Sequence, residues 1–189
     1  MWLNGPRSGS LVDMTTSEQT LTTGAWALDT NHSAVNFTVR HLGISKVRGR
    51  FNKFETSFVV DAAGAATIEA TIYLDSFDTG NEGRDGHVRS ADLLDVEKRP
   101  TLHFKAIEPV QVADEFEVVG EVTIGGVTKP VTLDVEWGGV QEAQDGKRHA
   151  GFSASGIIKR TELDVAPGVP NAVVSDKIAV ELDIQLIEP

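Results

Sequence analysis

The residues with the most potential for chemistry stand together in residues 79–92, a run rich in arginine, aspartate and histidine. Arg84, Asp85, His87 and Arg89 fall within six positions of this run. An arginine or a histidine here could donate hydrogen bonds to a carbonyl or hydroxyl group at the mouth of a cavity. The same residues could instead form a capped helix start whose ion pairs hold a loop in place. Both interpretations stay open, and the structural one is favoured for Arg84 and Asp85.

The chain lacks the motifs that accompany common catalytic sites. It has no G-x-S-x-G, no H-E-x-x-H, no phosphate-cradling glycine loop and no cysteine. The five histidines have no close ligand spacing, although a fold could bring them together; they are His32, His41, His87, His103 and His149. We therefore expect no catalytic residue, no metal site and no cofactor.

Residues 29–33 form a second polar segment, with the sequence Asp-Thr-Asn-His-Ser. It could contact a ligand, but Asp, Asn and Ser readily bond to the nearby backbone, so a cap at the start of a strand is the favoured interpretation. Trp26 and Trp137 lie in apolar patterns and are expected in the core.

Alternation of apolar and polar residues is the dominant pattern along the chain. Val35, Phe37 and Val39 alternate with polar residues, and the longest run of this kind spans residues 178–186. Strands with one apolar and one polar face are typical of antiparallel sheets that are wetted on one side. We count about eight such strands, and their length favours an all-β antiparallel barrel, which also removes exposed strand edges.

Two features interrupt the strands. Gly125-Gly126 predicts a two-residue hairpin turn, since such turns need positive φ. Residues 82–95 have a helical pattern, predicting one short inserted helix capped by Thr79 or Asn81 and carrying an Asp85–Arg89 ion pair.

The bulk composition restricts the classes of partner. The length of 189 residues indicates one domain, and the net charge of −11 argues against nucleic acid and against adhesion to an anionic membrane. The absence of cysteine, of a signal peptide and of an apolar run long enough to span a bilayer leads us to expect a cytoplasmic protein without a transmembrane segment. Residues 1–13 resemble a cloning remnant and residues 14–24 a disordered lead-in, which leaves 25–189 as the domain.

Several blocks, taken together and in order, resemble the YceI-like family over about residues 25–187. The residues that carry the resemblance are Asp29, His32, Ser33, Val35, Phe37, Val39 and His41; Gly49 and Phe51; Thr79, Asn81, Arg84, Asp85, His87, Arg89, Asp92 and Asp95; Pro100, Leu102 and Phe104; Gly120, Thr123, Gly126, Thr128, Lys129, Pro130 and Val131; Val174, Asp176 and Ile178.

This resemblance implies an elongated lipocalin-like barrel with an interior tunnel. The implied ligand is a long isoprenoid chain, such as the tail of a polyprenyl quinone, bound for carriage or storage without catalysis. An enzyme acting on such a lipid and a packed structural or stress-response barrel without a ligand stay open as alternatives, as does a homodimer. Many relatives carry an export signal.

The residues expected to contact the ligand are Val35, Phe37, Val39, His41, Ile72, Leu74, Arg84, His87, Leu94, Phe104, Leu133, Val135, Phe152, Ala154, Val180 and Leu182. Small residues inside the strands add to the expectation of an open interior; they are Ala70, Ala106, Gly120, Ala154 and Gly156. The alternative is that these small residues mark bulges or sharp bends.

Overall fold

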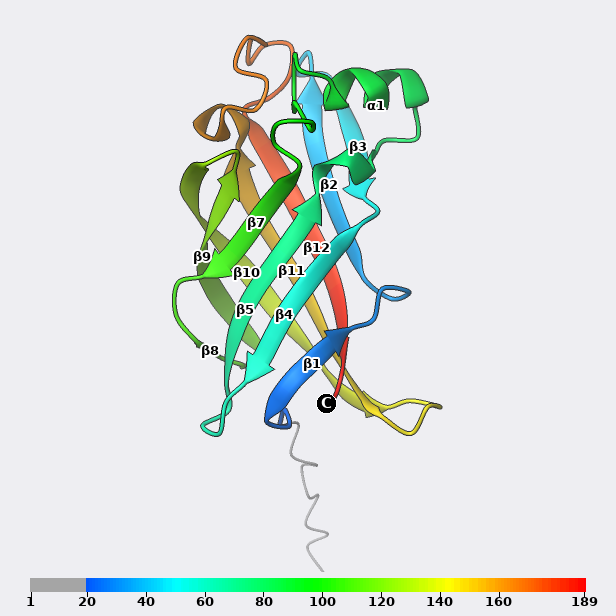
Figure 1. Cartoon of the computed structure of the whole chain (residues 1–189), viewed down its shortest axis with the longest axis vertical. Helices are drawn as coiled ribbons and strands as arrows, with labels where there is room; N and C mark the ends of the chain where they lie inside the picture. Colours follow the sequence, from blue (N-terminus) through cyan, green and yellow to red (C-terminus); the bar gives the residue numbers. More distant parts are fainter. Residues whose placement is uncertain (1–19) are drawn as a thin grey trace, which may run out of the picture.

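Twelve strands and one α-helix are formed by residues 20–189, the part of the chain that this computed structural model describes (Figure 1). The predicted remnant and most of the predicted lead-in lie outside the described residues. The strands are β1 (Gly24–Leu28), β2 (Ala34–His41), β3 (Ser45–Phe51), β4 (Phe54–Val60), β5 (Ala65–Tyr73), β6 (Phe77–Asp78), β7 (Thr101–Ala106), β8 (Val110–Gln111), β9 (Glu115–Ile124), β10 (Val127–Glu142), β11 (Arg148–Lys159) and β12 (Lys177–Ile187). The helix is α1 (Glu82–Arg89), and two 3₁₀ turns occupy η1 (Leu74–Ser76) and η2 (Arg160–Leu163).

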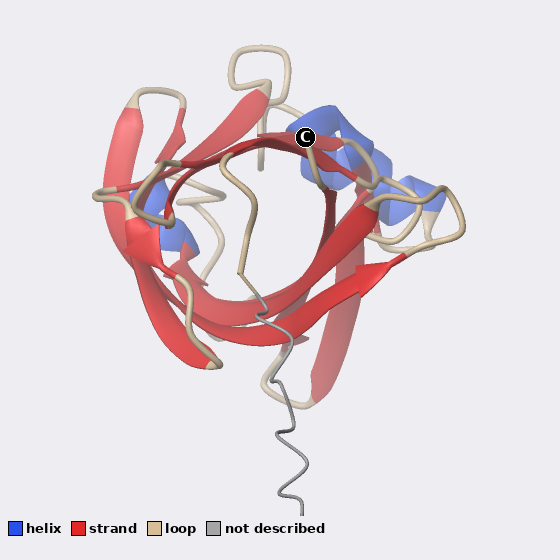
Figure 2. Ribbon diagram, turned by 90° about the horizontal axis from the view of Figure 1, so that it is seen from below, coloured by secondary structure: helices blue, strands red, loops and turns tan. Residues whose placement is uncertain are grey.

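The predicted all-β antiparallel barrel with one short helix is confirmed. Every strand pairing is antiparallel, and the ring runs β1–β4–β5–β7–β9–β10–β11–β12 before β12 pairs with β1 again (Figure 2). The β1–β4 and β1–β12 pairings close the ring, whereas β3 is paired on its second edge only at Arg50 and Phe51, with β6.

Two barrel positions are each shared by a pair of short strands. On the edge of β12, Leu28 pairs with Leu186 and Val35 pairs with Leu182, so β1 and β2 follow each other along one partner. In the same way β2 pairs with β3 while β1 pairs with β4. Two adjacent strands of the wall are therefore each interrupted, the first at residues 29–33 and the second at residues 52–53.

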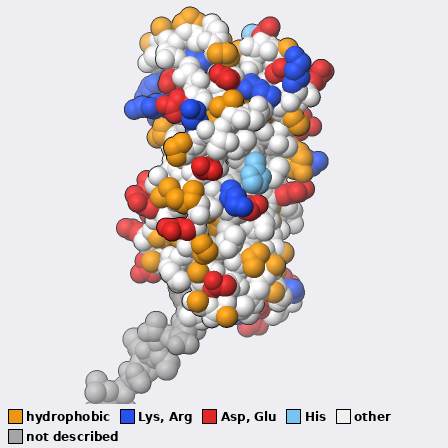
Figure 3. Space-filling model, turned by 60° about the vertical axis from the view of Figure 1, so that its left-hand side comes forward, with side chains coloured by type: hydrophobic (Ala, Val, Ile, Leu, Met, Phe, Trp, Pro, Cys, Tyr) orange, Lys and Arg blue, Asp and Glu red, His pale blue; other side chains and the backbone are white. Residues whose placement is uncertain are grey.

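The two ends of the barrel differ in what covers them. The helix end carries α1 together with residues 160–176, and the hairpin end carries the β10–β11 turn and the C-terminus (Figure 1). The face shown in Figure 3 has more lysine and arginine towards the helix end, whereas acidic side chains are spread along the barrel.

The Gly125-Gly126 turn has the predicted geometry. Their φ angles are +55° and +83°, which is the left-handed conformation at both central positions of a hairpin turn. It joins β9 to β10, whose ladder runs in continuous register from Val127–Ile124 onward.

The helix is shorter than the predicted 82–95. It ends at Arg89 with Ser90 as C-cap, and Asn81 rather than Thr79 is the N-cap, because its side chain accepts a hydrogen bond from the Arg84 N–H at 2.9 Å. Gly83 and Gly86 lower the helix propensity of this segment, by about 1 kcal/mol each relative to alanine. The expected Asp85–Arg89 pair does not form, since both side chains bond elsewhere.

Apolar side chains are buried at the hairpin end of the barrel. Trp26 is 3% exposed and its indole N–H donates to the Thr22 carbonyl at 2.8 Å. Leu186 and Ala150 are buried beside it in the same cluster. Residues 20–23, before β1, are thus in contact with the barrel. Among residues 20–189, no helix is long and apolar enough to cross a membrane.

Candidate functional site

The barrel encloses an apolar cavity of about 180 Å³. Its wall takes side chains from β2, β3, β4, β5, β7, β9, β10, β11 and β12, which together represent all eight barrel positions. The inward residues alternate with outward polar ones along each strand, as in Leu182 and Ile184 beside Asp183. The space therefore follows directly from the alternation in the sequence.

Ten of the sixteen predicted contact residues line this cavity: Val35, Phe37, Ile72, Phe104, Leu133, Val135, Phe152, Ala154, Val180 and Leu182. Their predicted inward orientation is confirmed, and contact with a ligand stays a prediction. The wall also contains Phe51, Phe54, Phe58 and Phe116, which the prediction omitted although their strands show the same alternation.

The remaining six predicted residues are not on the cavity wall. Leu74 and Leu94 are buried in the core, 1% and 7% exposed, and Val39 is half-buried farther along β2. The three polar candidates, His41, Arg84 and His87, are exposed.

The polar run before and within α1 holds its own loop. Arg84 donates from Nε to the Thr79 hydroxyl at 2.8 Å and from a terminal nitrogen to the Thr79 carbonyl at 3.2 Å. Asp85 is 4% exposed and accepts hydrogen bonds from the Thr79 N–H and hydroxyl. Arg84 and Asp85 therefore hold this loop, as the structural interpretation expected, but they do so through hydrogen bonds to Thr79 rather than through ion pairs.

Three phenylalanine rings gather above the cavity towards the helix end. Phe37 stacks with Phe77 at a centroid distance of 5.1 Å, and Phe51 lies 5.5 Å from Phe37. Leu94 and Val88 pack against this cluster from the α1 side. Phe37 and Phe51 of this cluster also line the cavity.

The expected open space is absent at two of the small residues. A Cβ on Gly156 would lie 2.8 Å from Cδ2 of Leu133, and one on Gly120 would overlap the Phe104 ring. These glycines let neighbouring side chains pack closely at the two positions. Ala106 is buried in the core away from the cavity wall, whereas Ala70 and Ala154 do line the cavity.

One hydroxyl in the wall has no hydrogen-bond partner. Thr56 points inward from β4 between Phe54 and Phe58, and its Oγ1 is buried without a donor or acceptor in reach. A buried polar atom without a partner is destabilising by about 1–3 kcal/mol. Thr56 and Asn36 are the two polar residues among those that line the cavity.

Arg99 ties two loops at the helix end together. It donates to the carbonyls of Leu93 and Leu94 on one loop and to those of Leu163 and Asp164 on the other, at 3.0–3.2 Å. The Ala166 N–H adds a backbone bond to the Leu93 carbonyl. These hydrogen bonds connect the loop at residues 93–94 with the loop at residues 163–166 across the helix end of the barrel.

Arg160 organises the second of these loops from within. It is 2% exposed and donates to the side chain of Asn171 and to five backbone carbonyls, those of Val165, Ala166, Val169, Val174 and Ser175. A guanidinium has five N–H donors in a fixed plane, which suits several carbonyls at once. No periodic pattern in the sequence predicts this role, because Arg160 stands directly after the end of β11.

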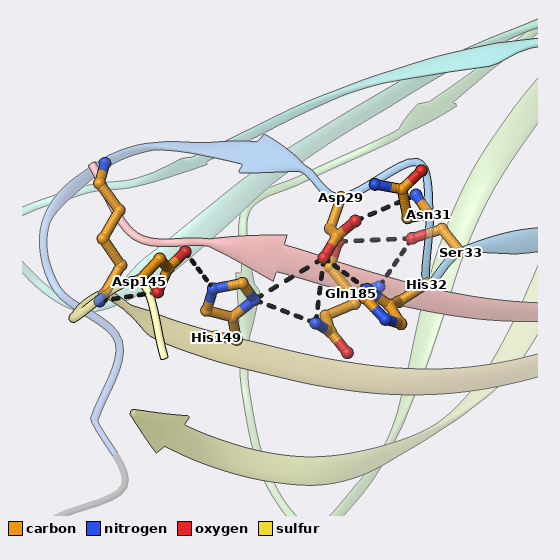
Figure 4. Close-up of polar contacts among 8 residues, drawn as sticks. Asp29, Asn31, His32, Ser33, Asp145, His149 and Gln185 are labelled. Carbon is orange, nitrogen blue, oxygen red and sulfur yellow. Dashed lines mark hydrogen bonds and ion pairs between the residues drawn. The ribbon is translucent and has the colours of Figure 1, made fainter. Parts of the chain in front are cut away.

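A polar cluster lies on the outer wall where β1 gives way to β2 (Figure 4). Asp29 bonds to the His32 ring at 2.8 Å and to Gln185 at 3.2 Å, and His149 bonds to Gln185 and to Asp145. The hydrogen bond from His32 holds the pKa of Asp29 below its ordinary value, and a bond from His149 does the same for Asp145.

This outer cluster is separated from the cavity. Gln185 points outward because its neighbours Ile184 and Leu186 point inward. Asp29 also accepts from the Asn31 N–H at 3.0 Å, which is a local turn contact. The favoured interpretation of residues 29–33 as a cap at a strand break agrees with these bonds. Within residues 20–189, no three His, Asp or Glu side chains are grouped so as to hold a metal ion.

Comparison with known proteins agrees with this architecture. The YceI-like domain matches residues 26–186. Protein YceI of Escherichia coli O157:H7 is 38% identical over 136 residues, covering 71% of both chains. A UPF0312 protein of Vibrio cholerae is 34% identical over 161 residues, covering 82% of this chain and 85% of the relative.

Solved structures show the same fold. The Campylobacter jejuni YCEI protein superposes with a TM-score of 0.71 at 31% identity, over 79% of this chain and 90% of that one. A polyisoprenoid binding domain from Saccharophagus degradans, implicated in plant cell wall breakdown, has a TM-score of 0.64 at 20% identity over 88% and 99% of the two chains. The likeness covers the barrel that encloses the cavity, and the chain belongs to the YceI-like family.

Proposed function

We propose that this protein binds the apolar chain of an isoprenoid lipid, such as a polyprenyl quinone, inside the barrel and carries or stores it without catalysis. The observation that supports this most is the cavity inside the barrel, whose wall is apolar at nearly every position. Thr56 and Asn36 are the polar residues that border it. Such a wall suits hydrocarbon and offers nothing to hold a charged substrate.

Burial alone is sufficient to drive binding of this kind. Each methylene withdrawn from water contributes about 0.8 kcal/mol, so one five-carbon isoprene unit contributes roughly 4 kcal/mol before the costs of ordering the chain. Affinity then grows with the length of chain that the barrel takes in, and no elaborate polar recognition is needed.

The size of the cavity sets a condition on the ligand. At about 180 Å³ it is smaller than the roughly 300–1,000 Å³ of typical small-molecule pockets. A long chain therefore fits only if phenylalanine side chains such as Phe37 and Phe51 rotate away. The packed barrel without a ligand is the second candidate, and the small volume is the observation that favours it.

The ligand class is inferred for this chain from its cavity and its family resemblance. The Saccharophagus domain is described as binding polyisoprenoid, but at 20% identity it shares the fold alone. An apolar interior without a charged group also supports binding over catalysis, because acid–base chemistry needs a titratable side chain beside the substrate.

Native mass spectrometry of the full chain, purified without detergent, tests the proposal. We expect a bound species with the mass of an isoprenoid lipid, released when the protein unfolds and unchanged in mass after incubation with the protein. A ligand-free protein that also shows no saturable binding of added polyprenyl alcohol would support the packed barrel instead. Conversion of the lipid into a product of another mass would support an enzyme.

A further inference from the structure

Three exposed apolar side chains cluster at the helix end of the barrel. Leu42 and Ile44, in the turn between β2 and β3, are 53% and 82% exposed, and Val173 in the adjoining loop is 37% exposed. The Leu42 N–H donates to the Val173 carbonyl at 2.9 Å, which holds the two segments side by side. These three residues are called the apolar tip below, and the β2–β3 turn that carries Leu42 and Ile44 lies at the helix end of the barrel (Figure 1).

The backbone of this turn adds to the cost of exposing leucine there. Leu42 has a φ of +52° and Gly43 a φ of +69°, so a bulky residue occupies the left-handed region that glycine or asparagine adopts more readily. Stability alone would favour a small polar residue at this position. Strain and exposure at the same residue suggest that Leu42 is used for contact with a partner.

A group of cations lies on the strands next to the apolar tip, with Arg40 and Lys46 paired two residues from Leu42 and Ile44. Arg40, Lys46, Arg48 and Lys177 are all exposed and border a surface hollow of about 540 Å³. We call these four residues the cation group. Among the described residues, none of their side chains forms an ion pair or a hydrogen bond. Arg40 stands directly opposite Lys46 in the β2–β3 register, an arrangement of like charges that destabilises a strand pair.

The acidic groups at the same hollow do not cancel these charges. Asp176 and Glu181 border it, so four cations face two carboxylates. Asp176 is already bonded to the hydroxyl and N–H of Thr161, at 2.7 and 3.0 Å. In a chain of net charge −11, this region is therefore locally positive.

We infer that the helix end docks on the surface of a bilayer that contains anionic lipids. The apolar tip would lie among the head groups and upper acyl chains, while the cation group faces the lipid phosphates. Charge complementarity and the exposed leucine and isoleucine favour a membrane over nucleic acid, whose phosphates would engage the cations alone. The net charge of −11 argued against adhesion to an anionic membrane. Because salt screens distant charges, the local positive charge of the cation group, rather than the net charge of the chain, acts on a nearby membrane surface.

This inference concerns the outer surface, so it stands or falls separately from ligand binding in the interior. The test uses the full chain and sucrose-loaded vesicles of phosphatidylcholine, with or without about 30% phosphatidylglycerol, in sedimentation assays. We expect binding to the anionic vesicles that weakens strongly between roughly 50 and 500 mM salt, because exposed charges are screened. We expect little binding to the neutral vesicles.

Two sets of variants separate the contributions. Removing three charges in R40A/K46A/R48A should weaken binding by roughly 100-fold, at about fivefold for each cation near an anionic surface. Leu42→Asn with Ile44→Ser should weaken it by at least about tenfold, because two apolar side chains no longer leave water. Asparagine is chosen at position 42 because it tolerates positive φ.

Matched controls lie away from the helix end. Ile107→Ser removes an isoleucine that is 59% exposed between β7 and β8, and Lys147→Ala removes an exposed cation in the β10–β11 turn. Both should bind vesicles like the wild type. Thermal unfolding of every variant checks that the barrel is intact, and binding of a polyprenyl probe in vesicle-free solution checks the interior.

The inference is overturned if the wild type shows no preference for anionic vesicles. It is equally overturned if either tip or cation variant binds them as the wild type does, or if the control variants lose binding to the same degree. Vesicle binding without any polyprenyl binding would leave the docking surface in place and refute the proposed function alone.

Discussion

Gly49 of β3 lies directly opposite Phe37 of β2, and the Phe37 ring occupies the space that a side chain on Gly49 would need. A Cβ at Gly49 would also stand 2.8 Å from Cγ2 of Thr79, on the loop before α1. The absence of a side chain at Gly49 thus lets β2, β3 and the loop before α1 pack closely. It allows the ring to lie across the partner strand and to stack on Phe77.

Gly49→Ala should therefore destabilise the protein. Overpacking a filled interior is destabilising by about 1–3 kcal/mol, because the Phe37 ring or the Thr79 loop must move. Urea unfolding measures the change. Gly151→Ala is the matched control, since a Cβ there meets nothing within 4 Å, and its free energy of unfolding should change little. Equal effects of both substitutions would contradict the close packing of Phe37 on Gly49.

Thr56→Val should raise the free energy of unfolding by about 1–2 kcal/mol. Valine has nearly the same shape, and it removes a buried hydroxyl that has no partner. Thr161→Val is the comparison, because the Thr161 hydroxyl donates to Asp176 at 2.7 Å and its loss should be destabilising. Thermal or urea unfolding of the two variants should give shifts of opposite sign; a loss of stability in Thr56→Val would show that its hydroxyl is satisfied.

Arg160→Lys should destabilise the protein by about 3 kcal/mol or more, although it keeps the charge. A lysine has three donors at one point and cannot reach the six acceptors that the guanidinium serves across residues 165–175, so buried carbonyls lose their partners. Hydrogen exchange should show faster opening of that loop. Arg48→Lys, at an exposed site without a side-chain partner, should be close to neutral.

The Asp29 contacts predict a pH dependence of stability. Its pKa in the folded protein is lowered from the ordinary 3.8, chiefly by the bond from His32, so its contribution is full above that ordinary value and is lost as the pH falls through the lowered pKa. Asp29→Asn should be less stable than the wild type at pH 6, and the difference should shrink towards pH 2–3. Urea midpoints at both pH values measure this, and a difference that does not change with pH would rule it out.

Much of the fold follows from the sequence because the barrel wall repeats one physical rule. Apolar residues alternate with polar ones along each strand, so residues such as Leu133 and Val135 could be assigned to the interior. The Gly125-Gly126 pair correctly predicted the hairpin turn between β9 and β10. The shared positions of β1 with β2 and of β3 with β4 could not be inferred, because a break such as residues 29–33 looks like an ordinary turn until the partner strand is known.

The site was harder to predict where polar residues are concerned. Arg84 and His87 are residue types that often contact polar ligand groups, but neither lies on the cavity wall. Arg84 bonds to Thr79 instead, and His87 is exposed in the last turn of α1. Arg160 gave no signal, because its partners are backbone carbonyls, whose positions depend on the loop and not on residue type.

Titration of a polyprenyl alcohol against Ala154→Phe tests the central claim most directly. Ala154 lines the cavity between Val135 and Leu182, so a phenyl ring there fills the space in which the lipid chain would lie. Ser155→Phe places the same ring on the exposed outer face of β11 and serves as the control. The account predicts saturable binding by the wild type and by Ser155→Phe, and a loss of affinity of about tenfold or more in a folded Ala154→Phe variant. Equal affinity of all three proteins would contradict the claim that the chain binds inside the barrel.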